Sequence, residues 1–207
     1  MLTREEIKNI FVKAEAFIFD SHIIYTSGKH GKAYVNKDAL YPHTELTSLL
    51  CKQIALHFQA KQIDAVLAPA LGGIILSQWT SHHLSQLTGR EVLGVYAEKS
   101  SENESFVIKR GYDSLIKNKK VLVIEDILTT GKSVKKVIET ARTIPCEVVG
   151  VAALCNRGGV TSSSIGGVPE LFSLLEVTLE TWDPSDCPMC KEHTPINTSV
   201  GKGKSLT

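Results

Sequence analysis

The chain has 207 residues, of which 43% are hydrophobic and 22% are charged, and its formal net charge is +1. This length suits one domain, which can bury enough surface to fold without a disulfide or a metal ion. The near-zero charge gives no reason to expect nucleic acid or an acidic membrane as a partner. No apolar run reaches the roughly 18 residues that a transmembrane helix needs.

The N-terminal segment does not resemble a secretory signal, because charges are scattered through it and no apolar stretch follows. Thr3 and Glu6 instead form the pattern of a capping box, which predicts that a helix begins there. Five cysteines in a chain with no export signal indicate a reduced, cytoplasmic protein.

Helices and apolar strands alternate along the rest of the chain. Helical spacing of apolar residues predicts helices over 43–59, 73–87 and 133–143. Apolar runs predict strands at 64–69, 91–98, 119–126, 147–156 and within 171–180. This alternation predicts an α/β fold with a central parallel sheet flanked by helices. Ligands of such sheets bind at the carboxyl ends of the strands, which are residues 69–73, 97–99, 125–133 and 155–159.

The stretch VLVIEDILTTGKS, residues 121–133, joins a buried strand to two acids and an anion-binding turn. The backbone N–H groups of the turn and the N-terminus of the next helix suit a phosphate, and Gly131 allows close approach. A Walker A loop is excluded, because that motif needs glycine where Asp126 stands. The acids suit the vicinal hydroxyls of a ribose whose 5-phosphate occupies the turn. The alternative is an ordinary strand–loop–helix junction with solvated acids.

This stretch resembles the 5-phosphoribosyl 1-diphosphate (PRPP) motif of the type I phosphoribosyltransferases. The resemblance implies that Glu125 and Asp126 hold the ribose 2- and 3-hydroxyls and that the loop after them holds the 5-phosphate. The PRPP-binding residues implied here are Glu125, Asp126, Ile127, Leu128, Thr129, Thr130, Gly131, Lys132 and Ser133.

The segment VLAPALGGI, residues 66–74, is a strand that ends in a tight turn. Its glycines expose backbone N–H groups that suit a diphosphate, although close helix–strand packing would also favour glycine. The segment resembles the diphosphate loop of the same family, formed here by Ala70, Leu71, Gly72 and Gly73. Some members have a lysine in this loop; its absence here implies contact through the backbone.

Residues 25–38 resemble the element of the orotate phosphoribosyltransferase branch that closes over the base. The resemblance implies that Ser27, Gly28 and Tyr34 contact orotate. Other members have a lysine where Thr26 stands, and this departure argues against a diphosphate contact by residue 26. The alternative for this segment is a surface loop with one buried tyrosine.

GVAALCNRGG, residues 150–159, resembles the strand of that branch whose arginine binds the orotate carboxylate. Arg157 stands at this position, and a planar guanidinium suits bidentate binding of a carboxylate. An arginine at a strand end is otherwise a common surface ion-pair partner. Many relatives have aspartate where this chain has Asn156. Thr129 is implied as a further orotate contact.

The polar segment 98–112 resembles the family's catalytic lid, for which a solvated loop is the alternative. Lys99 best matches the basic residue that reaches the diphosphate of a neighbouring subunit, and Lys109 and Arg110 match a following element. Glu102 and Glu104 make the middle of the lid acidic. Such a lid would keep water away from an oxocarbenium-like centre.

Cys187 and Cys190 form a Cys-x-x-Cys pair, which can supply two of four zinc ligands. His193 lies near in sequence, and Cys155 or another cysteine would have to complete a site. Some orotate phosphoribosyltransferases carry a similar CPxC tail, and that resemblance implies no metal. We therefore expect no metal bound by protein side chains, and Mg2+ held mainly through PRPP.

The resemblance covers roughly residues 20–198. It implies one phosphoribosyltransferase domain over residues 1–207, with hood elements at about 18–40 and 180–198. The composition of the tail, residues 199–207, suits disorder.

The implied reaction joins orotate and PRPP into orotidine 5-phosphate and diphosphate, a step of pyrimidine nucleotide synthesis, in a homodimer with shared active sites. Lys99, Glu125 and Asp126 would carry the chemistry. A transferase for another base is one alternative, which Arg157 argues against because neutral bases offer no carboxylate. A PRPP-sensing regulator that binds nucleic acid is the other, and the net charge does not support it.

Overall fold

The computed structural model describes residues 1–25, 27–101 and 105–206, and the chain divides into two compact units. The first unit consists of Met1–Lys8 and His43–Val177, and the second of Asn9–Pro42 and Thr178–Thr207. No helix in the described ranges is long and apolar enough to cross a membrane.

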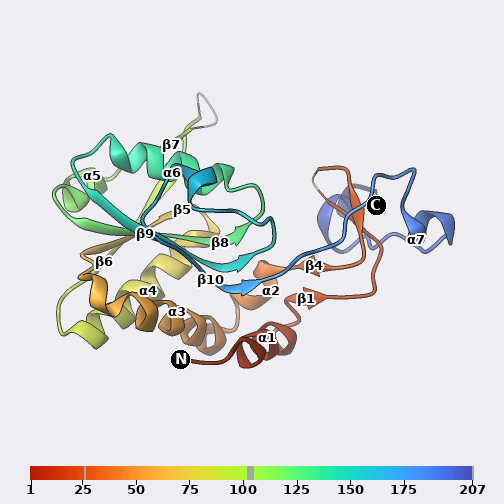
Figure 1. The fold of residues 1–207 in the computed structure, drawn as a ribbon, viewed down its shortest axis with the longest axis horizontal. Coiled ribbons are helices and arrows are strands. Elements are labelled where there is room, and N and C mark those ends of the chain that lie inside the picture. Colours follow the sequence, from red (N-terminus) through yellow and green to blue (C-terminus); the bar gives the residue numbers. More distant parts are fainter. Residues whose placement is uncertain (26, 102–104, 207) are drawn as a thin grey trace. The chain divides into compact units, whose positions relative to one another are not determined.

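The elements of the fold are labelled in Figure 1. The α-helices are α1 (Arg4–Lys13), α2 (Lys37–Leu40), α3 (Thr44–Phe58), α4 (Gly72–Thr88), α5 (Tyr112–Ile116), α6 (Lys132–Arg142) and α7 (Pro188–Lys191). The strands are β1 (Phe17–Ile18), β2 (Ile23–Ile24), β3 (His30–Gly31), β4 (Tyr34–Val35), β5 (Ala65–Pro69), β6 (Leu93–Lys99), β7 (Phe106–Val107), β8 (Lys120–Leu128), β9 (Glu147–Asn156) and β10 (Leu171–Glu176). Short 3-10 helices are η1 (Gln59–Lys61), η2 (Ser163–Ile165) and η3 (Gly201–Leu206).

The first unit is built on a six-stranded sheet with the order β10-β9-β8-β5-β6-β7. All neighbouring strands are parallel except β6 and β7. β5 pairs with β6 on one side and with β8 on the other, so the strand order reverses at β5. The carboxyl ends of β5 and β8 therefore flank the switch point at which open α/β sheets bind their ligands.

Helices cover both faces of this sheet, with α3 and α4 on one face and α5 and α6 on the other (Figure 1). On α6, the side chains of Val134, Val137, Ile138 and Ala141 are fully buried. Their spacing places them on one face of the helix, and they belong to the same apolar cluster as Leu67. This packing holds the N-terminus of α6 against the sheet.

The fold expected from the sequence is confirmed. The expected helices over 43–59, 73–87 and 133–143 are α3, α4 and α6, and each end lies within one residue of its expected place. The capping box also forms, because Thr3 N–H donates to Glu6 Oε2 (2.8 Å) and Glu6 N–H donates to Thr3 Oγ1 (3.2 Å). The last strand is shorter than expected, since β10 ends at Glu176.

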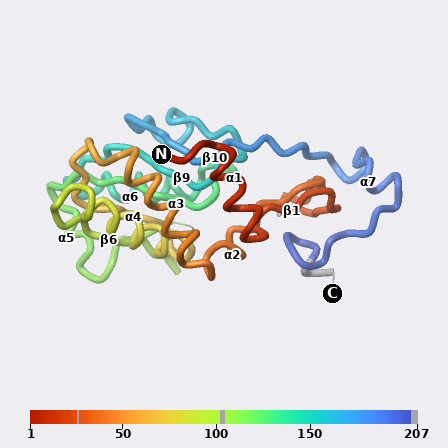
Figure 2. The backbone as a smooth tube through the Cα atoms, turned by 90° about the horizontal axis from the view of Figure 1, so that it is seen from below, coloured from red at the N-terminus to blue at the C-terminus, as the bar shows by residue number. Residues whose placement is uncertain are grey.

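The second unit contains two short antiparallel pairs, β1 with β4 and β2 with β3. Its C-terminal segment (blue) runs beside the N-terminal strands (orange) in Figures 1 and 2, and single bridges join His30 to Trp182 and His22 to Ile196. Ile23, Tyr25 and Val200 form a small buried apolar cluster. The segment 199–207 contains η3.

Leu67→Ala should lower the free energy of unfolding by about 2–5 kcal/mol, because the side chain is fully buried in central strand β5 and its loss leaves a cavity. Leu87→Ala on α4 is the matched control: Leu87 is 38% exposed, and its truncation should cost less than about 1 kcal/mol. Urea denaturation of both variants measures the difference. Equal losses would contradict this account of the core.

Candidate active site

Strand β8 carries two carboxylates to the carboxyl edge of the sheet. Glu125 and Asp126 are only 8% and 6% exposed. Glu125 Oε1 accepts a hydrogen bond from Asp126 N–H (3.1 Å), and Asp126 Oδ1 accepts one from Ile127 N–H (2.6 Å). Burial of a carboxylate is costly unless it accepts hydrogen bonds, and both acids accept one. The two carboxylates are therefore stabilised at the switch point, where a ligand is expected to bind.

The turn after β8 is shaped by Gly131, the residue that precedes α6. Its φ of 71° lies in the left-handed region, and a Cβ there would lie 2.6 Å from Ile165 Cγ2. Both the backbone and the packing therefore require glycine. The first N–H groups of α6 have no acceptor within the helix, which makes this turn suitable for an anion.

Arg157 follows β9, the strand beside β8, and lies against the same turn. The N–H groups of Arg157 and Gly158 both donate to Leu128 O (2.9 and 3.1 Å), and Arg157 Nε donates to Thr129 Oγ1 (3.0 Å). A Cβ on Gly158 would collide with the Thr129 carbonyl group, so only glycine allows this approach. The structure thus joins the expected carboxylate-binding arginine to the expected phosphate loop.

Asn156, to which the sequence alone gives no role, has a structural one in the loop after β9. Its Nδ2 donates to Val160 O (2.9 Å) and its Oδ1 accepts from Val160 N–H (3.0 Å), which closes the loop that carries Arg157. Aspartate could make the second of these bonds but, when ionised, could not donate the first. Asparagine side chains often bond to nearby backbone groups in turns, so an asparagine at the start of this loop was the sequence signal that could have predicted its role.

The loop between β5 and α4 forms the other side of the switch point. Ala70 N–H donates to Ala97 O (2.8 Å), and the Ala70–Leu71 peptide bond is cis. Helix α4 begins directly at Gly72, and a Cβ on Gly73 would lie 2.8 Å from Ala68 Cβ. A cavity of about 570 Å³ adjoins this loop and is lined by Ala70, Leu71, Ile74, Tyr96, Glu98, Lys99 and Arg110. Lys99 thus lines a cavity beside Ala70 and Leu71 of its own chain, whereas the resemblance implies that it reaches the diphosphate of a neighbouring subunit.

Lys99 lies at the base of a hairpin formed by β6 and β7. It is paired with Phe106, and Ser100 N–H donates to Ser105 O (3.0 Å). Glu102 and Glu104, the expected acidic middle of the lid, lie outside the described residues.

Arg110, which in the sequence matches the element following the lid, is hydrogen-bonded to the end of β6. Its Nε donates to Glu98 Oε1 (2.6 Å), and its guanidinium carbon lies 6.0 Å from the centre of the Tyr96 ring. The hydrogen bond to Glu98 raises the pKa of Arg110. This bond ties Arg110 to Glu98, the residue directly before Lys99 in β6.

The expected base-closing residues belong to the second unit. Ser27 and Gly28 lie in the turn between β2 and β3, where Gly28 has a φ of 86° and its N–H donates to Tyr25 O (2.9 Å). Tyr34 lies in β4. Thr26 lies outside the described residues.

The cysteine pair of the second unit has partners different from those that the sequence suggested. Its neighbours are His22 and His30, and neither Cys155 nor His193 is part of this group. Cys155 lies in β9, where burial raises the pKa of its thiol to about 12. It therefore remains an inert, protonated thiol near neutral pH.

Comparison with known proteins decides the family. A family model described as the phosphoribosyl transferase domain matches residues 39–186. The orotate phosphoribosyltransferase of Desulforamulus reducens is 36% identical over 194 residues, which cover 94% of this chain and 95% of the relative. That of Caldicellulosiruptor saccharolyticus is 32% identical over 195 residues, again 94% and 95% of the two chains. This chain belongs to the orotate phosphoribosyltransferase family.

Solved structures agree with the fold of an orotate phosphoribosyltransferase. The Mycobacterium tuberculosis H37Rv enzyme, crystallised with PRPP, matches with a TM-score of 0.64 at 19% identity over 84% of this chain and 96% of that one. Adenine phosphoribosyltransferase from Thermoanaerobacter pseudethanolicus matches with a TM-score of 0.60 at 14% identity over 84% and 99%. At such identities the likeness concerns the fold, and the type I phosphoribosyltransferase fold is therefore confirmed.

Proposed function

We propose that this chain transfers the 5-phosphoribosyl group of PRPP to orotate, giving orotidine 5-phosphate and diphosphate, in pyrimidine nucleotide synthesis. The observation that carries the proposal is the contact of Arg157 Nε with Thr129 Oγ1 (3.0 Å). It sets a carboxylate-binding group directly beside an anion-binding turn, as a reaction between orotate and a sugar phosphate requires. Full-length similarity to orotate phosphoribosyltransferases supports the same substrates.

The PRPP site is proposed to extend across the switch point. Glu125 and Asp126 accept hydrogen bonds from the ribose 2- and 3-hydroxyls, and residues 129–133 bind the 5-phosphate through backbone N–H groups and hydroxyls, with Ile127 and Leu128 completing the PRPP-binding stretch. The backbone of residues 70–73 binds the diphosphate. As the bond from C1 to diphosphate breaks, positive charge develops on the sugar, and the two nearby carboxylates stabilise it. Lys99 of the neighbouring subunit neutralises the departing diphosphate.

The orotate site is proposed to lie beside the ribose. Arg157 binds the orotate carboxylate with two parallel hydrogen bonds, and Thr129 adds a hydroxyl group. Ser27, Gly28 and Tyr34 are the proposed contacts from the hood. Holding both substrates in one geometry converts a bimolecular reaction into an effectively unimolecular one.

Mg2+ is the proposed cofactor, held mainly through PRPP. The donor set fits it, because Glu125 and Asp126 present carboxylate oxygens at one strand end and Mg2+ prefers oxygen ligands. When bound, the ion offsets the negative charge of the diphosphate. The cytoplasm is the proposed compartment, and it suits five cysteines that are all free of disulfides.

A direct assay tests the proposal. Purified protein, Mg2+, PRPP and orotate are mixed, the loss of orotate absorbance is followed, and the products are identified by mass spectrometry. We expect PRPP-dependent formation of orotidine 5-phosphate. Binding of PRPP by calorimetry without consumption of orotate would overturn the orotate assignment. Uracil, adenine and hypoxanthine serve as a panel of other bases.

The active sites of a homodimer are proposed to be shared through Lys99. Lys99→Ala and Asp126→Asn should each be nearly inactive alone. After subunit exchange between the two variants, each heterodimer should regain one complete site, because the intact Lys99 of one chain serves the intact Asp126 of the other. Activity of the mixture measures this recovery. A mixture that forms heterodimers, seen by native mass spectrometry, yet stays inactive would contradict the shared site.

A further inference from the structure

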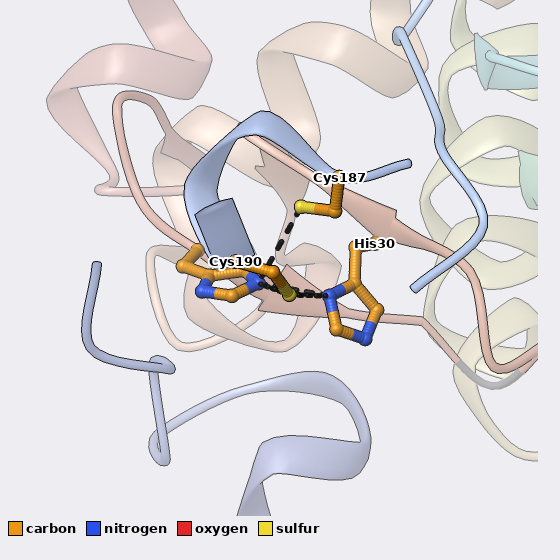
Figure 3. A group of neighbouring side chains, drawn as sticks. His30, Cys187 and Cys190 are labelled. Carbon is orange, nitrogen blue, oxygen red and sulfur yellow. Dashed lines mark hydrogen bonds between the residues drawn. The ribbon is translucent and has the colours of Figure 1, made fainter. Parts of the chain in front are cut away.

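Four side chains of the second unit converge on one point, and three of them are labelled in Figure 3. They are His22, which precedes β2, His30 of β3, Cys187, and Cys190 of α7. One ligand atom from each of them lies within 4.8 Å of all the others. His22 and Cys190 are 168 positions apart in the chain, so the group exists only in the folded protein.

The spacing of these atoms suits a tetrahedral metal ion. His22 Nε2 lies 2.8 Å from His30 Nδ1, 3.7 Å from Cys187 Sγ and 3.6 Å from Cys190 Sγ. Cys190 Sγ lies 3.2 Å from His30 Nδ1. Around a tetrahedral zinc ion, with bonds of about 2.0–2.1 Å to nitrogen and 2.3 Å to sulfur, ligand atoms lie about 3.3–3.8 Å apart. Small side-chain adjustments, mainly between the two imidazoles, would admit the ion.

The hydrogen bonding of His22 prepares it as a ligand. Its Nδ1 lies 2.8 Å from Thr194 O, and a carbonyl oxygen can only accept, so Nδ1 carries the proton. In the neutral ring, Nε2 then presents its lone pair to the cluster. A ligating histidine whose other nitrogen donates to a backbone carbonyl is the usual outer-shell arrangement of a protein metal site.

The cluster is also protected from solvent. His22 is 2% exposed, His30 7% and Cys187 fully buried, whereas Cys190 is half-buried. The two cysteines are not joined by a disulfide, and they flank the start of α7, whose first residue is Pro188. Two sulfur and two nitrogen atoms that already approach one another in this largely buried group can all bind a single metal ion.

The sulfur and nitrogen donor atoms of the cluster indicate which metal ion it would bind. Two sulfur and two nitrogen ligands in tetrahedral arrangement are typical of zinc, whereas Mg2+ and Ca2+ prefer oxygen. Four protein ligands leave no open position for a substrate, which is the mark of a structural site. We propose that His22 Nε2, His30 Nδ1, Cys187 Sγ and Cys190 Sγ bind one structural zinc ion.

A zinc ion at this site would stabilise the second unit. The second unit has strands of only two residues each, and its own buried apolar cluster is small. Zinc would join the β2–β3 hairpin to the C-terminal segment and so restrain two distant parts of the chain. The proposal rests on these contacts and is independent of the reaction assigned above.

Metal analysis of the full-length protein, purified without chelators in the presence of a reducing agent, tests the proposal. We expect about one zinc ion per chain, and a zinc content at least about tenfold lower in Cys190→Ser. Cys146→Ser and His193→Asn are matched controls, because both residues lie outside the cluster, and they should keep the wild-type zinc content.

Spectroscopy on the wild-type protein tests the zinc site even if Cys190→Ser fails to fold. X-ray absorption at the zinc edge should fit two sulfur atoms at about 2.3 Å and two nitrogen atoms at about 2.0–2.1 Å. Cobalt exchanged into the site should show the visible bands of tetrahedral coordination and thiolate charge transfer. Wild-type protein without zinc that binds no cobalt, unchanged zinc in folded Cys190→Ser, or a Cys187–Cys190 disulfide in freshly purified protein would each overturn the proposal.

Discussion

Asp126→Asn should lower kcat/KM for PRPP by a factor on the order of 10² to 10³. The charge-assisted hydrogen bond to a ribose hydroxyl and the stabilisation of positive charge at C1 together represent about 3–4 kcal/mol. The substitution removes charge with little change of shape. Asparagine Oδ1 can still accept the hydrogen bond from Ile127 N–H (2.6 Å) that Asp126 accepts. Glu125→Gln, for which the same argument holds with Asp126 N–H, should act in the same direction.

Steady-state kinetics with varied PRPP measures this effect, and thermal unfolding checks that the variants are folded. Glu139→Gln is the matched control, because Glu139 is an exposed acid of α6 whose nearest basic partner, Lys135 Nζ, is 4.0 Å away. It should keep kcat/KM within about twofold, as expected of a surface substitution. If folded Asp126→Asn retained wild-type kcat/KM, its proposed contact with the ribose would be wrong.

Arg157→Ala should lower kcat/KM for orotate by a factor on the order of 10² to 10³, because a bidentate charge-assisted pair with the carboxylate is lost. The substitution should weaken the binding and use of orotate, and not the binding of PRPP. PRPP affinity, measured by calorimetry, should change little, since the backbone bonds from residues 157 and 158 to Leu128 O remain available. Arg157→Lys should recover only part of the activity, because an ammonium group cannot form the planar fork.

Arg90→Ala is the matched control for Arg157. Arg90 precedes β6 and so lies at the amino ends of the strands, whereas Arg157 lies at their carboxyl ends. Arg90 Nη1 is 3.4 Å from Asp64 Oδ1. Its removal should leave kcat/KM for both substrates near the wild-type values. Equal weakening of orotate and PRPP by Arg157→Ala would instead assign Arg157 to supporting the phosphate loop.

Local features of this protein were accessible from the sequence because they depend on neighbours along the chain. The capping box of Thr3 and Glu6, the apolar stripe of α6 and the turn at Gly131 each involve residues a few positions apart. Hydrophobic periodicity and backbone stereochemistry determine such features. The α/β class and the ends of the long helices followed from the same local rules.

The short strands of the second unit could not be predicted from the sequence, because they depend on residues that are distant along the chain. Strands β1 to β4 have two residues each, too few to show a period, and they form only because a partner strand pairs with them. The order of the central sheet is likewise a property of pairing between distant segments.

The amino-acid sequence by itself determined the candidate PRPP motif, because its acids, glycine and hydroxyls are consecutive. Only the tertiary structure decided that Arg157 meets Thr129 across two neighbouring strands and that Asn156 closes the loop beside them. It also decided that Cys187 and Cys190 meet His22 and His30, whereas the sequence offered His193 and Cys155 as the residues that would complete a site and led us to expect no metal there. Proximity along the chain is a poor guide to ligand sets, since the folding of the backbone brings together groups that lie more than a hundred positions apart.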